Sequence, residues 1–156
     1  MKQLLSIWLR RLLHMLTFLS GEGSWSLRPV EAQLIKAALD HIDEADGKLL
    51  ASQLSESFFV ERINPRIVVL RFYKIGSDQV VCSPDFEDKL IRVHFVADGK
   101  RQVSNVCVFE GVIFSVEMKD PRLLRKAKQL TVEKVVAGTP KQSLTRVIDR
   151  SEHGSG

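Results

Sequence analysis

The stretch Leu90–Met118, LIRVHFVADGKRQVSNVCVFEGVIFSVEM, decides the fold. Apolar and polar residues alternate along it, as side chains do on the two faces of a β-strand. The dipeptides Asp98-Gly99 and Glu110-Gly111 interrupt the alternation, and such pairs favour tight two-residue hairpin turns. The stretch therefore predicts three consecutive antiparallel strands, which cover 90–97, 102–109 and 112–118.

The same alternation continues toward the N-terminus of this stretch. Residues 58–63 and 66–74 are rich in β-branched and aromatic residues, and Asn64-Pro65 separates them. They predict two more strands, which makes five strands arranged as an antiparallel meander.

The pattern between Pro29 and residue 55 has a helical period. Apolar residues recur every three or four positions after Pro29, and Gly47 is predicted to end this first helix. Residues 48–55 predict a short second helix. Asp120-Pro121 predicts a third over 121–129, and residues 131–136 fit either an edge strand or an extended arm. The fold class is therefore α+β, with helices packed on the sheet, one domain over 25–136 and a loose tail over 137–156.

Residues 1–20 form a separate amphipathic segment, which Gly21-Glu22-Gly23-Ser24 joins to the domain as a predicted flexible break. On a helical wheel the polar face holds Arg10 and His14, and the opposite face holds Trp8 and several leucines. Charges interrupt the apolar run, which argues against a membrane span, and no small-x-small cleavage site precedes Gly21. Two interpretations stay open: a helix in the membrane interface, with Trp8, Arg10 and Arg11 as contacts, or a helix packed on the core or a partner. A translation start at Met15 is a further alternative.

The net charge of +4 comes from one region of the chain. Residues 1–100 hold equal numbers of basic and acidic side chains, whereas residues 101–156 hold ten basic and six acidic ones. Half of those ten lie in the predicted helix and just before it, which suggests a phosphate-binding face. Aromatic residues that would stack on bases are missing around it, so nucleic acid is the less favoured partner. The candidate partner-binding residues here are Arg122, Arg125, Lys126 and Lys128.

The sequence contains none of the common catalytic or nucleotide-binding signatures, such as HExxH, GxSxG or GxxxxGK[ST]. Its acidic run over 40–46 matches no known cation loop and is predicted to lie at a helix C-terminus, where the macrodipole disfavours negative charge. Cys82 and Cys107 have no metal-ligand spacing and are predicted to be buried thiols. We therefore expect no catalytic residue, no metal and no cofactor.

Arg92 and His94 complete the set of candidate partner-binding residues. Both are predicted on the exposed face of one strand, where Arg71 or Lys74 from a neighbouring strand could join them. No second polar residue is spaced to orient His94 as a general base, so we expect a binding surface here rather than a catalytic one.

Three segments, LRPVEAQLIKAAL (Leu27–Leu39), LLASQL (Leu49–Leu54) and VFEGVIFSVEM (Val108–Met118), resemble small bacterial domains, some of which are similar to immunity proteins of secreted toxins. The resemblance covers residues 25–136 and implies a cytoplasmic, non-catalytic inhibitor that binds a cognate toxin. The basic charge of the chain disfavours a nuclease toxin as that partner, because immunity proteins against nucleases are typically acidic. Two alternatives remain, namely a membrane-peripheral protein anchored by residues 1–20 and a nucleic-acid-binding protein that uses the helix at 119–128.

Overall fold

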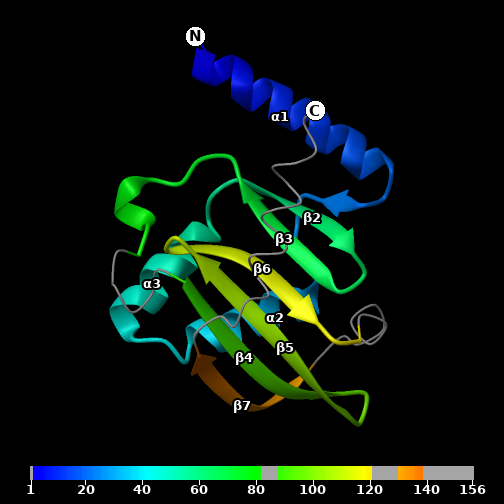
Figure 1. Ribbon diagram of the computed structural model, residues 1–156, viewed down its shortest axis with the longest axis vertical. Helices are drawn as coiled ribbons and strands as arrows, with labels where there is room; N and C mark the ends of the chain where they lie inside the picture. The colour runs from blue at the N-terminus through cyan, green and yellow to red at the C-terminus, as the bar shows by residue number, and fades with distance from the viewer. Residues whose placement is uncertain (1, 82–87, 121–129, 139–156) are drawn as a thin grey trace.

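The computed structural model describes residues 2–81, 88–120 and 130–138. The fold is α+β with an antiparallel sheet, as predicted (Figure 1). Its elements in chain order are α1 (Lys2–Leu19), β1 (Gly23–Ser24), α2 (Pro29–Leu39), α3 (Glu44–Gln53), β2 (Phe58–Asn64), β3 (Ile67–Phe72), the 3-10 turn η1 (Ser77–Gln79), β4 (Asp88–Ala97), β5 (Lys100–Phe109), β6 (Val112–Met118) and β7 (Thr131–Gly138).

The sheet has seven strands in the order β1-β2-β3-β6-β5-β4-β7, which corrects the prediction of a five-strand meander. β1 and β7 are the two additional strands, and β7 extends along β4 as far as Gly138. β4, β5 and β6 do form a meander, but β3 pairs with β6 and not with β4. The prediction failed here because strand order depends on long-range pairing, which local alternation does not encode.

The two predicted hairpin turns are confirmed. Asp98 and Gly99 join β4 to β5 with φ angles of 50° and 72°, and Glu110 and Gly111 join β5 to β6 with 49° and 72°. Positive φ at both central residues defines the turn whose twist matches that of the strands. These turns hold the three consecutive strands β4, β5 and β6 in register.

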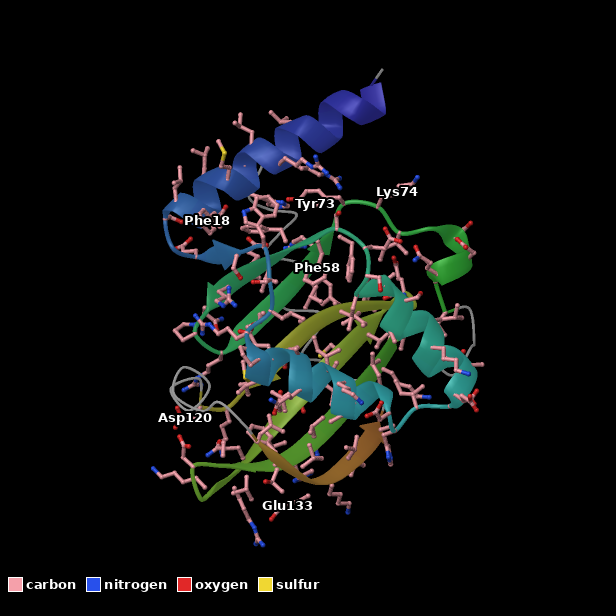
Figure 2. All side chains as sticks on the ribbon, turned by 180° about the vertical axis from the view of Figure 1, so that it is seen from behind. Phe18, Phe58, Tyr73, Lys74, Asp120 and Glu133 are labelled. Atoms are coloured by element: carbon pink, nitrogen blue, oxygen red, sulfur yellow. The ribbon has the colours of Figure 1, made fainter. Side chains whose placement is uncertain are left out.

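α2 and α3 lie against one face of the sheet, the face nearer the viewer in Figure 2. Leu34 of α2 and Leu50 of α3 are fully buried there with Val93, Val106 and other inward residues of the strands. The helix boundaries differ from the prediction, because α2 ends at Leu39 and Gly47 lies in the first turn of α3. An added Cβ at Gly47 would lie 3.0 Å from the Leu39 carbonyl oxygen, so glycine allows the two helices to approach closely here.

Gln53 anchors α3 to the end of β6. Its side chain is fully buried, and its Nε2 donates to the carbonyl oxygens of Gln79 and Gly111 at 2.7 and 3.0 Å. Its Oε1 accepts a hydrogen bond from the Ile113 N–H at 3.0 Å. One amide side chain therefore satisfies three backbone groups, from η1, from the β5–β6 turn and from β6.

Residues 21–24 are an ordered connection and not the predicted flexible break. Gly21, with φ of 79°, ends α1, and the N–H groups of Gly21 and Glu22 bind the carbonyl oxygens of Phe18 and Thr17. These two bonds form a Schellman motif. Gly23 then pairs with Glu61 of β2, and the ring of Phe59 occupies the space of a Cβ at Gly23. The predicted helix at 121–129 and the tail beyond residue 138 lie outside the described residues.

Candidate functional site

The helix α1 lies at one end of the molecule, beside β1 and β2 (Figure 1). It meets the domain through polar side chains. The ring of His14 stacks on Phe59 with a centroid distance of 4.4 Å, and its Nδ1 lies 2.7 Å from the hydroxyl oxygen of Tyr73. The Arg11 guanidinium lies over the Tyr73 ring, 5.2 Å from its centroid. Tyr73 is therefore the main contact below the helix (Figure 2).

The opposite side of α1 is apolar and exposed. The leucines at 9, 12, 13, 16 and 19 recur every three or four residues, so they share one face of the helix. Their exposed fractions range from 52% to 73%. His14, on the other side of the helix, is less exposed because it packs against the domain. A helix that packs on its own core shows the reverse orientation. We call this surface the leucine face, which consists of Leu9, Leu12, Leu13, Leu16 and Leu19.

Burial affects the protonation of both residues at the contact between α1 and the domain. It lowers the pKa of His14 below its usual value of 6.5, and the nearby Arg71 and Arg10 lower it further while Glu61 opposes them. Burial likewise raises the pKa of Tyr73, against the opposing effect of Arg11. At neutral pH both groups are therefore uncharged, and their hydrogen bond joins two neutral partners.

A cavity of about 780 Å³ lies between α1, β3 and the β5–β6 hairpin. β3 and β6 pair only from Ile67 to Val69, and the cavity opens where the paired region ends. Its lining combines cationic residues with apolar ones. The cationic residues are Arg10, Arg71 and Lys74, and the phenylalanines are Phe72, Phe109 and Phe114.

Arg92 and His94 both lie on β4, and they point away from the helix-covered face because Val93 and Phe95 point into the core. Arg92 is exposed and His94 is half-buried. Their predicted neighbours Arg71 and Lys74 do not join them, because β5 and β6 separate β4 from β3. On the other side, β7 places Val136 opposite Arg92 and Lys134 opposite His94.

Of the remaining predicted residues, Arg10 and Arg11 are exposed on α1, while Trp8 lies on the same helix without a described side chain. Arg122, Arg125, Lys126 and Lys128 fall outside the described residues.

The acidic run is divided between two helices. Asp40 caps α2 and pairs with Lys36, whereas Glu44 and Asp46 lie in the first turn of α3, where the macrodipole favours negative charge. The predicted cost at a helix C-terminus therefore does not apply to these two acids. Within 2–81, 88–120 and 130–138, no three His, Cys, Asp or Glu side chains are grouped closely enough to hold a metal ion.

A polar cluster that sequence reasoning missed lies on the other face of the sheet. Cys107 is paired with Ser115, and Asn105 with Glu117, across β5 and β6. Burial raises the pKa of the Cys107 thiol to about 12, and Glu117 adds to this effect while the Ser115 hydroxyl opposes it. Burial also raises the pKa of Glu117, against a hydrogen bond from Asn105. The Cys107 thiol is therefore protonated at neutral pH and a poor nucleophile, since only the thiolate reacts. Cys82, the other predicted buried thiol, lies outside the described residues.

Comparisons with protein families, with curated proteins and with solved structures found no significant match. Among the described helices, none has the length and apolarity that crossing a bilayer requires. Two features of the described structure suit a ligand or a surface. They are the exposed leucine face of α1 and the cavity beneath that helix.

Proposed function

We propose that this chain is a peripheral membrane protein, which rests on a negatively charged lipid surface through the leucine face of α1. One observation carries the proposal: the leucine face points away from the domain while the polar side of the same helix contacts it. An amphipathic helix that lies in the membrane interface has the same orientation, with its apolar face in the acyl boundary and its polar face toward water.

The basic residues of α1 support the choice of an anionic surface. Arg10 and Arg11 are exposed on the polar side of α1, so they add positive charge close to a membrane in which the leucines are inserted. A basic side chain near an anionic membrane contributes about 1 kcal/mol. Burial of a leucine contributes on the order of 1–2 kcal/mol, so five leucines are the larger contribution.

The test is flotation of the full-length chain with lipid vesicles. We expect flotation with vesicles that contain phosphatidylglycerol, and at least tenfold less binding for Leu12→Glu/Leu16→Glu, because each carboxylate would enter the acyl boundary. The matched control is Val132→Glu/Val136→Glu, since both are exposed apolar residues on β7, at the sheet edge opposite β1. The control should float like the parent chain.

Two results would contradict the proposal. The first is a parent chain that stays out of the vesicle fraction at low salt. The second is a concentration-dependent dimer that the Leu12→Glu/Leu16→Glu change abolishes while vesicle binding stays unchanged, because the leucine face would then bind a second copy.

The immunity-type and nucleic-acid-binding interpretations stay predictions. Arg92 and His94 offer an exposed arginine and a half-buried histidine on β4, but no described contact identifies a protein partner for them. The basic residues of 119–128 are described only in part.

A further inference from the structure

We propose that the cavity between β3 and β6 binds a free alkyl carboxylate, with the carboxylate at Arg10, Arg71 and Lys74 and the alkyl chain against Phe72, Phe109 and Phe114. The proposal does not depend on membrane association, because a dissolved ligand would reach the site in the absence of lipid.

The cavity is a consequence of how β6 is held. On the N-terminal side of Ser115, β6 has no pairing with β3, and the backbone of Gly111 and Ile113 is bound instead by Gln53 and by the N–H of Val81. This part of β6 is therefore hydrogen-bonded without β3, so the two strands can stay apart. The resulting volume of about 780 Å³ lies within the usual range for sites that bind small molecules.

The walls of the cavity are mainly apolar. The rings of Phe109 and Phe114 lie in contact, with their centroids 6.0 Å apart, and Phe72 lines the cavity from β3. Leu70 and Ile113, which also line it, belong to the buried core. An alkyl chain placed here would leave water and contact hydrocarbon on several sides, which is favourable in proportion to the area buried.

Three cations and one carboxylate line the same cavity. Arg71 uses its Nε for an ion pair with Glu61 at 2.8 Å, which leaves the ends of its guanidinium group available. Arg10 and Lys74 make no hydrogen bond or ion pair within the described part of the chain, and Lys74 lies on the loop that leaves β3 (Figure 2). Glu110 is the one acid in the lining, and His14 is neutral at neutral pH, so positive charge is in excess. An anion is therefore favoured over a cation or a neutral head group, and a carboxylate matches the planar fork of arginine.

Calorimetric titration of the full-length chain with decanoate, below its critical micelle concentration, tests the proposal. We expect saturable binding to one site, at least tenfold tighter than the binding of decanol, acetate or inorganic phosphate. Arg10→Gln/Lys74→Gln should weaken decanoate binding at least tenfold. The matched control is Arg66→Gln/Lys100→Gln, which removes an exposed arginine and an exposed lysine outside the cavity and should leave binding unchanged.

A second variant tests the position of the alkyl chain. Val112→Trp fills the cavity from β6 and should abolish decanoate binding without changing vesicle flotation, because the leucine face is untouched. In nuclear magnetic resonance spectra of the parent chain, decanoate should shift the ring signals of Phe109 and Phe114.

Three results would overturn the proposal: no saturable binding of decanoate, binding of phosphate or decanol as tight as that of decanoate, or shifts confined to the leucine face. If vesicle flotation fails while decanoate binds as expected, the membrane function is wrong and the cavity site stands. If the chain floats with vesicles while decanoate does not bind, the cavity site is wrong and the membrane function stands.

Discussion

Gly99 and Gly111 have the same backbone conformation in different surroundings. Each follows a residue with positive φ in a two-residue turn, and each has φ of 72°. A Cβ added at Gly99 would meet nothing within 4 Å, whereas one at Gly111 would collide with the carbonyl oxygen of Val81 and lie 2.9 Å from its nitrogen. The backbone of Val81 therefore packs directly on the second turn.

This difference predicts unequal costs for the same substitution. Gly99→Ala should lower the free energy of unfolding by about 1 kcal/mol, the usual cost of a side chain at positive φ. Gly111→Ala carries the same cost together with displacement of the Val81 backbone, so we expect a loss of about 3 kcal/mol or more. Urea denaturation of both variants measures the difference. Equal losses in the free energy of unfolding would show that the Val81 backbone can move away from an added Cβ at no cost in stability.

At the residue scale, the sequence predicts local conformation better than contact. Asp98-Gly99 and Glu110-Gly111 are predicted because their turn type is a property of the dipeptide. Gly47 and Gly23 are misassigned because their role depends on the Leu39 carbonyl and on the Phe59 ring, which are distant in the sequence or belong to another element. Residue type alone carries no signal for such contacts.

Among the elements, α2 and β2 are joined by the buried ion pair of Glu31 and Arg62. The side chain of Glu31 is 1% exposed and that of Arg62 is 14% exposed, with Nη2 3.0 Å from Oε2. Glu31 also accepts the Arg28 N–H at the start of α2, and Arg62 Nη1 donates to the hydroxyl oxygen of Ser24 in β1. The pair thus connects α2, β1 and β2 at one point.

Removal of one partner should be strongly destabilising. Glu31→Ala leaves the Arg62 guanidinium buried without its counter-charge, and we expect a loss of about 3–5 kcal/mol in the free energy of unfolding. The control is Glu44→Ala, which breaks the exposed pair with Lys48 and should cost less than about 0.5 kcal/mol. Denaturant titration of the two variants distinguishes them. A loss at Glu31 no greater than that at Glu44 would mean that water reaches Arg62 in the folded protein.

The prediction of elements succeeded where the alternation was long and regular. β4, β5 and β6 have clear alternation, and their hairpin turns define the pairing. β1 is only two residues long and leaves no periodic signal, and β7 is mostly exposed, so its residues alternate weakly. The pairing of β3 with β6 involves segments about fifty residues apart, which no local pattern reports.

On the scale of the whole molecule, α1 is attached to the domain by a titratable group. The pKa of His14 is lowered in the folded protein, so the unfolded chain binds more protons between that lowered pKa and 6.5. This contribution to stability is complete above pH 6.5 and is lost as the pH falls through the lowered pKa. Protonation of His14 also places a positive charge close to Arg10 and Arg71.

We therefore expect that acidification from about pH 7.5 to about pH 5.5 destabilises the parent chain more than His14→Phe, which keeps the stacked ring on Phe59 but cannot be protonated. Paired denaturation curves at the two pH values measure this difference, and effects of other titrating groups cancel in the comparison. Identical pH dependence in the two chains would exclude His14 as the source.

The sequence predicts the amphipathic character of residues 1–20 but not the direction of the leucine face. A membrane helix and a core-packed helix show the same distribution of apolar residues on a helical wheel. They differ in which side of the helix contacts the domain, and here it is the polar side. The partner there is Tyr73, more than fifty residues away. The cavity was not predicted either, because it results from separation of β3 and β6 and not from any motif.

The attachment of Gln53 to β6 has a consequence for hydrogen exchange. The amide hydrogen of Ile113 is bound by a side chain of α3 and not by a neighbouring strand. Its exchange with deuterium therefore follows the departure of α3 from the sheet, whereas amides paired between β5 and β6 follow the opening of the strands themselves. The exchange rate at this single amide thus distinguishes detachment of α3 from opening of the strands.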